Sequence, residues 1–198
     1  MIQIPNFLFL LCAAFVIMLV ATWLMRKQSQ FFFTKDPVRR KFSILEMEFP
    51  VKSFDLEYLI KGIHDLPDEA DKTVTAVHRQ LLVGSLLFIP ALYGSIYILC
   101  MHVAVNVETP AIGRWWFVML GWAQLVSLLL DYVENIYFWR MVGNKNIVIP
   151  KPDLSKPEIA APSFKMIQIL EIVKWGIVLI GFVCSISVMA YFWLIGNY

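Results

Sequence analysis

Long apolar runs separated by polar segments are the dominant pattern of the chain. An α-helix of about 20 apolar residues crosses the hydrocarbon core of a bilayer. Four runs reach or approach that length: residues 7–25, 81–105, 115–139 and 170–195. No Lys or Arg precedes the first run and no small-residue cleavage site closes it, so we expect an uncleaved span. The pattern predicts an all-α membrane protein, a four-transmembrane-helix bundle that forms one membrane domain over residues 1–198.

The second run extends a helical pattern that starts before it. Ala70, Val74, Val77 and Leu81 recur at intervals of three and four residues, which places them on one helix face. The spacing predicts one long helix over residues 68–105, and Pro90 predicts a kink within it because proline lacks the backbone N–H.

Two short elements are predicted in the polar segment between the first two runs. Apolar residues at alternate positions of residues 42–51, FSILEMEFPV, predict a short strand, although Pro50 is unfavourable within a strand. A second stripe, made of Leu56, Leu59, Ile60 and Ile63, predicts a short amphipathic cytoplasmic helix over residues 53–64 with Ser53 as its N-cap. Four prolines in residues 141–162 predict an extended segment between the last two spans.

The basic residues are concentrated on one side of the predicted membrane. Residues 26–79 hold ten of the 17 Lys and Arg residues, residues 140–174 hold six, and Arg114 is the remaining one. Cytoplasmic loops of membrane proteins carry the excess of Lys and Arg. Residues 26–79 and 140–165 are therefore expected in the cytoplasm, with both termini outside.

Composition agrees with a membrane protein and supplies no catalytic signature. The chain is 59% hydrophobic and 16% charged, whereas soluble domains are about 25% charged. The formal charge of +2 gives no reason to expect a nucleic-acid partner. The three cysteines, Cys12, Cys100 and Cys184, lie in apolar runs without a CxxC motif and are read as small buried hydrophobes. We expect no catalytic residue, no cofactor and no metal, since no sequence motif for any of them is present.

The third apolar run contains carboxylates at positions where a membrane-spanning helix is expected to be apolar. At helical spacing one face collects Gln124, Ser127, Asp131, Glu134 and Asn135. A carboxylate at the centre of a spanning helix costs about 2.5–3.5 kcal/mol, so this face must turn towards protein, water or a ligand. The other segments bring further polar residues to a similar depth, and these complete the candidate intramembrane polar cluster: His78, Arg79, Arg140, Glu171 and Lys174.

Three interpretations of this cluster remain open. In the first, the charges are structural ion pairs, with Asp131 and Glu134 matched to Arg79, Arg140 or Lys174. In the second, the carboxylates form a proton, ion or headgroup site. In the third, the oxygen and nitrogen donors of Asp131, Glu134 and His78 bind a metal, although their spacing matches no known metal motif. His64, on the polar side of the 53–64 helix, is expected to be solvated.

Three segments resemble a known group of proteins. DYVENIYFWRMV (131–142), SLLFIPALYGSIYILC (85–100) and FSILEMEFP (42–50) are similar to segments of a group of uncharacterised bacterial four-span integral membrane proteins. In that group an Asp-x-x-Glu-Asn element ends the third span. The resemblance implies a location in the bacterial inner (cytoplasmic) membrane, and it implies no activity.

Two classes of function are consistent with these patterns. The first is a non-enzymatic accessory or scaffold subunit, or a bundle that binds lipid or a partner. The alternative is a small proton- or ion-coupled carrier or a lipid-modifying enzyme that uses the Asp131 and Glu134 cluster. The expected partners are the lipid bilayer, anionic lipid at the 35–41 basic run, and a membrane protein partner or a second copy of the chain.

Overall fold

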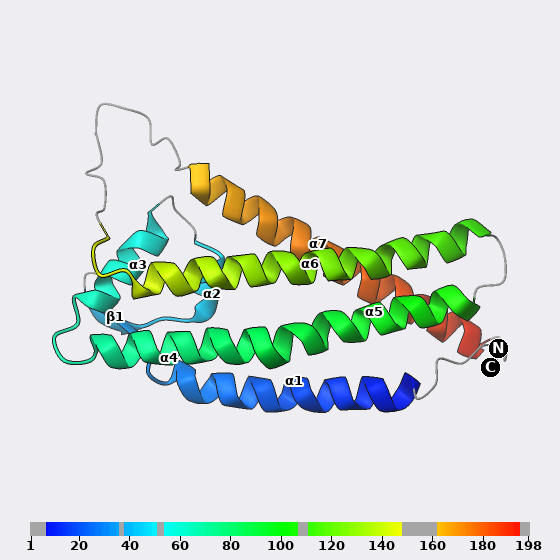
Figure 1. Ribbon diagram of the computed structural model, residues 1–198, viewed down its shortest axis with the longest axis horizontal. Coiled ribbons are helices and arrows are strands. Elements are labelled where there is room, and N and C mark those ends of the chain that lie inside the picture. The colour runs from blue at the N-terminus through cyan, green and yellow to red at the C-terminus, as the bar shows by residue number, and fades with distance from the viewer. Residues whose placement is uncertain (1–6, 36–37, 51–53, 107–110, 148–161, 195–198) are drawn as a thin grey trace. The chain divides into compact units, whose positions relative to one another are not determined.

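The computed structural model describes residues 7–35, 38–50, 54–106, 111–147 and 162–194 (Figure 1), of which 85% are helical. Four of the helices are long and apolar enough to span a membrane: Phe7–Ser29, Ala70–Asn106, Gly113–Gly143 and Gln168–Leu194. The four predicted spanning segments are therefore confirmed in their length and composition. Most of the predicted extended segment over residues 141–162 lies outside the described residues.

The second long helix contains an irregular turn. Helix α4 (Ala70–Val83), the π-helical turn η1 (Gly84–Phe88) and helix α5 (Ile89–Asn106) follow one another without a break. Pro90 lies just after η1, and in a regular α-helix its ring would clash with the carbonyl of residue 86 while its missing N–H left that carbonyl without a donor. A π-helical turn changes the hydrogen-bond spacing at this point. The π-helical turn η1 thus ends two residues before Pro90, the residue at which the sequence predicts a kink.

The described chain divides into two compact units. Unit 1 takes Met1–Thr22, Gly84–Tyr132 and Val173–Tyr198, and unit 2 takes Trp23–Val83 and Val133–Ile172. Three helices contribute residues to both units, namely α1 (Phe7–Ser29), α6 (Ala111–Gly143) and α7 (Pro162–Leu194).

Unit 1 has an apolar core inside and an apolar surface outside. Its core is formed by buried side chains of three helices: Tyr93, Ile96, Cys100 and Val103 on α5, Phe117 and Leu120 on α6, and Val178 on α7. The outer surface is also apolar, since Leu8, Val126 and Leu179 are 72%, 54% and 62% exposed. Apolar surface of this extent is unfavourable in water and suits a hydrocarbon environment.

Unit 2 combines short helices with a small hairpin. The strands β1 (Phe33–Lys35) and β2 (Arg39–Lys41) pair antiparallel, with Phe33 opposite Lys41 and Lys35 opposite Arg39. The core of the unit takes side chains from the hairpin region, from the short helices, from α4 and from the end of α6: Phe32, Phe42, Met47, Leu56, Leu59, Ile60, Ile63, Ala76, Val77, Leu81, Phe138 and Val142.

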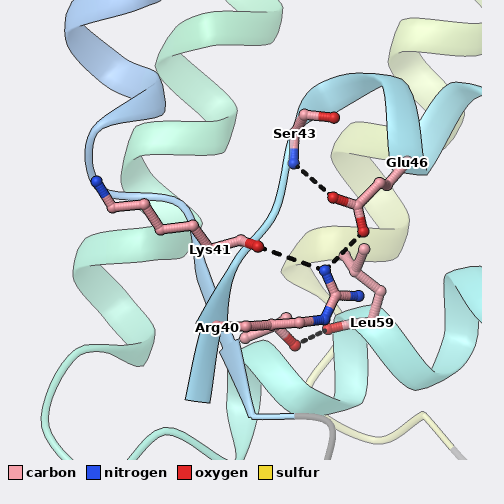
Figure 2. Close-up of polar contacts among 6 residues, drawn as sticks. Arg40, Lys41, Ser43, Glu46 and Leu59 are labelled. Atoms are coloured by element: carbon pink, nitrogen blue, oxygen red, sulfur yellow. Dashed lines mark hydrogen bonds and ion pairs between the residues drawn. The ribbon is translucent and has the colours of Figure 1, made fainter. Parts of the chain in front are cut away.

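The predicted strand over residues 42–51 is wrong, because this segment contains the helix α2 (Ile44–Glu48). Its start is stabilised locally: the backbone N–H of Ser43 donates to Oε1 of Glu46 at 3.0 Å, as in a capping box. Figure 2 shows that the other carboxylate oxygen of Glu46 faces the guanidinium of Arg40, at 2.7 Å. Met47 of α2 is fully buried in the core of unit 2, so the apolar residues of this segment are used at helical spacing.

The predicted amphipathic helix is confirmed as α3 (Asp55–His64), with Leu56, Leu59, Ile60 and Ile63 buried. Its N-cap is Phe54, and the predicted cap Ser53 lies outside the described residues.

The hairpin lies directly on α3 at a glycine. A Cβ atom on Gly62 would come within 2.3 Å of Thr34 Oγ1 and 3.0 Å of the Lys35 carbonyl oxygen, so only glycine allows this approach. The Thr34 hydroxyl donates to the Leu59 carbonyl oxygen at 3.0 Å. Gly62 and this hydrogen bond therefore set the position of β1 on α3.

Candidate intramembrane polar site

Asp131 is bound by two side chains from two other helices. The ammonium of Lys174, on α7, donates to Asp131 Oδ1, and the hydroxyl of Tyr93, on α5, donates to Oδ2 at 2.7 Å. The Lys174 side chain is 4% exposed and the Asp131 side chain 16%. Because a buried charge is tolerated when it is paired and hydrogen-bonded, each of the two ions compensates the burial of the other. One carboxylate thus joins α5, α6 and α7.

Two further polar residues lie on the same face of α6, nearer its N-terminus. Gln124 and Ser127 are both fully buried. The Gln124 amide nitrogen donates to the Ile177 carbonyl oxygen of α7 at 3.0 Å. This contact needs Gly181, because a Cβ atom there would come within 2.4 Å of the same nitrogen. Among the described residues, Gln124 Oε1 and Ser127 Oγ have no hydrogen-bond partner.

The other six candidate residues belong to unit 2. Glu134 and Asn135 are half-buried, Glu171 is 1% exposed, and both arginines, Arg79 and Arg140, are exposed. Gln124, Ser127, Asp131 and Lys174 belong to unit 1 and the other six candidates to unit 2. The single cluster of ten residues stays a prediction. Of the cations proposed to pair with Asp131, the structure identifies Lys174.

Two histidines bind backbone carbonyls near the end of α6. The His78 ring stacks on Trp139, with centroids 4.2 Å apart, and its Nε2 lies 3.0 Å from the Trp139 carbonyl oxygen. The His64 Nε2 lies 3.0 Å from the Val142 carbonyl oxygen. The expectation that His64 is solvated is therefore wrong, because it is half-buried and bonded to the last turn of α6. The last four carbonyl groups of a helix lack intrahelical donors, and the His64 ring supplies one to Val142 here.

Sequence reasoning missed Tyr93 as a partner of Asp131. The residue lies within a long apolar run, where it reads as one more aromatic core residue. The available signal is its hydroxyl, since a buried tyrosine usually finds a hydrogen-bond partner.

Both oxygens of Asp131 already accept a hydrogen bond. Within the described ranges, no group of three or more His, Cys, Asp or Glu residues could hold a metal ion. The site joins helices, and in unit 1 two of its buried side-chain oxygens, Gln124 Oε1 and Ser127 Oγ, have no partner among the described residues.

Fold and site together define a mostly helical protein with four helices able to span a membrane and a buried ion pair in its apolar unit. No protein-family model, no curated protein and no solved structure matches the chain. The resemblance to bacterial four-span proteins stays a prediction.

Proposed function

We propose that the chain is an integral membrane protein that acts as an accessory or scaffold subunit, binding lipid or a partner protein without catalysing a reaction. The observation that carries this proposal is that each oxygen of the Asp131 carboxylate accepts a hydrogen bond from a side chain of another helix. A carboxylate that binds protons or ions during transport has to exchange its partners. Asp131 instead has Lys174 on one oxygen and Tyr93 on the other, and its side chain is 16% exposed.

The proposed location is the bacterial inner membrane, with residues 26–79 and 140–165 in the cytoplasm and both termini outside. The distribution of Lys and Arg supports this orientation. Epitope tags placed before residue 1 and after residue 198 are expected to react with an impermeant antibody on spheroplasts. Protection of either tag would contradict the orientation.

A transport assay tests the absence of a proton-coupled function. Wild-type protein and the Asp131→Asn variant are reconstituted into liposomes that contain a pH-sensitive dye, and an acid step is applied outside. We expect both preparations to lose the pH gradient at the rate of protein-free vesicles. Gramicidin, added last, confirms that the dye responds. Faster loss with the wild type that Asp131→Asn abolishes would contradict the proposal.

One observation favours the second candidate, a small proton- or ion-coupled carrier or a lipid-modifying enzyme. Gln124 Oε1 and Ser127 Oγ are buried without a partner in the described part of the chain, whereas most buried polar atoms in proteins are hydrogen-bonded. These two oxygens are the acceptors that a polar ligand would use. The liposome assay separates the carrier from the scaffold. A lipid-modifying enzyme would require that the wild-type protein form a modified lipid and that Ser127→Ala no longer form it.

A further inference from the structure

The two faces of the β1–β2 hairpin differ in chemistry. Side chains of directly opposed residues lie on the same face of an antiparallel pair, so the register places Phe33, Lys35, Arg39 and Lys41 together on one face. Thr34 lies on the other face, where it is fully buried and bonded to α3. That face rests on the core of unit 2, and the first four residues form the outer face of the hairpin.

Arg40 does not belong to the outer face. Its guanidinium donates to Glu46 Oε2 at 2.7 Å and supports the start of α2. Figure 2 shows the side chains of Arg40 and Lys41 on opposite sides of the strand, with the Lys41 ammonium directed away from Glu46. The basic run is therefore divided: one cation stabilises the fold and its neighbour is presented outwards.

The outer face holds three exposed cations and one aromatic ring, and two of the cations lie over that ring. The Arg39 guanidinium lies 4.8 Å and the Lys41 ammonium 5.5 Å from the centroid of Phe33. Arg39 also pairs with Glu69 at 2.7 Å, but 56% and 41% of the two side chains are exposed, and such surface pairs contribute little. Lys35 and Lys41 are exposed as well. Three cations against one carboxylate leave the outer face positive.

Cations also lie over aromatic rings elsewhere in unit 2, and there the rings are exposed. The Lys27 ammonium lies 4.2 Å from the ring centroid of Trp23, and that of Lys72 lies 4.6 Å from Phe31. Trp23 is 56% exposed and Phe31 38% exposed. Exposed aromatic rings favour the interfacial region of a bilayer, where adjacent cations meet lipid phosphates. This chemistry suits a lipid surface better than a soluble anionic partner.

Chain connectivity keeps the hairpin near the membrane surface. Helix α1 ends at Ser29, and Phe33 begins β1 four residues later. An extended chain covers at most about 3.3–3.6 Å per residue, so Phe33 lies within about 14 Å of the end of that spanning helix.

We propose that the outer face of the hairpin binds the phosphate headgroup of an anionic phospholipid. Lys35, Arg39 and Lys41 supply N–H donors and charge to the phosphate, and Phe33 holds two of these cations in place. The inference rests on the proposed membrane function and names a lipid partner for it.

Lipid binding to the full-length protein in detergent tests this inference. Native mass spectrometry follows titrations with dioctanoyl phosphatidylglycerol, dioctanoyl phosphatidylcholine and inorganic phosphate. Each basic residue near an anionic surface contributes about 1 kcal/mol, so removing two corresponds to about 30-fold in affinity. We expect tighter binding of phosphatidylglycerol than of phosphatidylcholine by the wild type, and a loss of about tenfold or more in the Lys35→Gln, Lys41→Gln double variant.

Two control variants remove positive charge from positions outside the outer face of the hairpin. Lys61 and Lys145 are exposed lysines of unit 2 outside the hairpin, and their double substitution by Gln removes the same two charges. Arg40→Gln removes a charge within the basic run but on the opposite side of the strand. Both are expected to keep phosphatidylglycerol affinity within about twofold of the wild type, with circular dichroism confirming that each variant is folded.

Three results would overturn the inference: no preference for phosphatidylglycerol in the wild type, an equal loss in the Lys61, Lys145 control, or binding of inorganic phosphate as tight as that of the lipid. Alkaline carbonate extraction of native membranes tests the proposed membrane function separately. A protein that stays in the membrane fraction but shows no lipid preference refutes only the lipid site. A protein that carbonate releases refutes the embedding itself.

Discussion

Replacing Gly62 by alanine is expected to destabilise unit 2, although alanine is the better helix former. The new Cβ would lie 2.3 Å from Thr34 Oγ1 and 3.0 Å from the Lys35 carbonyl oxygen. The threonine side chain is able to rotate away, but the second contact is with backbone and requires β1 to move. The substitution therefore acts on the contact that seats the hairpin on α3.

The opposing contributions can be compared. Alanine in place of glycine stabilises a helix by about 1 kcal/mol. Forcing extra volume into a packed site costs about 1–3 kcal/mol, and loss of the hydrogen bond from Thr34 to Leu59 costs about 1 kcal/mol more. The net expectation for Gly62→Ala is a decrease of about 1–3 kcal/mol in the free energy of unfolding.

Thermal unfolding of the purified protein in detergent measures this change. For a chain of this size about 1 kcal/mol corresponds to about 2–4 °C in Tm. Gly94→Ala is the matched control, because a Cβ atom there meets nothing within 4 Å, and its Tm is expected to stay or rise. Hydrogen exchange at the amides of β1 should accelerate only in Gly62→Ala. An unchanged Tm with unchanged exchange in that variant would refute the close approach of β1 to α3.

Two further substitutions test local contacts. Glu46→Ala removes both the N-terminal hydrogen bond of α2 and the ion pair with Arg40, and it should lower the free energy of unfolding by about 1–2 kcal/mol. Glu46→Gln keeps an acceptor for the backbone N–H and should therefore cost less stability. Equal Tm values for the two variants would contradict the capping role. Gly181→Ala displaces the buried Gln124 amide and should lower the free energy of unfolding by about 1–3 kcal/mol. Gly176→Ala, with open space around its Cβ, should leave the Tm unchanged. Equal Tm values for the two variants would argue against the contact between Gly181 and Gln124.

The long helices and α3 were predictable because their signals are local. A run of about 20 apolar residues, or a stripe at helical spacing, depends only on neighbouring positions of the chain. The segment that became α2 was ambiguous, since its apolar residues fit both a strand and a short helix. Its Ser43 and Glu46 spacing is the signature of a helix start, and it outweighs the alternation. The hairpin has strands of only three residues, too short for a periodic pattern, and its position depends on the distant Gly62.

The site was predictable to the level of one helix face. Helical spacing groups Gln124, Ser127 and Asp131, and the structure buries the first two completely. Which cation meets Asp131 depends on the rotation of α7 about its own axis, and residue spacing carries no information on that rotation. Lys174 was one of three open alternatives for that reason. Tyr93 was missed because a single hydroxyl in an apolar run leaves the hydrophobic pattern unchanged.

The most direct measurement of the structural role of Asp131 is a double-mutant cycle with Lys174. The free energy of unfolding of each variant is measured in mixed micelles. Breaking a buried pair by removing one partner costs about 3–5 kcal/mol. We predict that Lys174→Met lowers the free energy of unfolding by nearly that amount. Asp131→Asn should lower it by less, because asparagine still accepts a hydrogen bond from the lysine. The double variant should lose clearly less than the sum of the two. Unchanged or increased stability of Asp131→Asn, with additive effects in the double variant, would contradict the account.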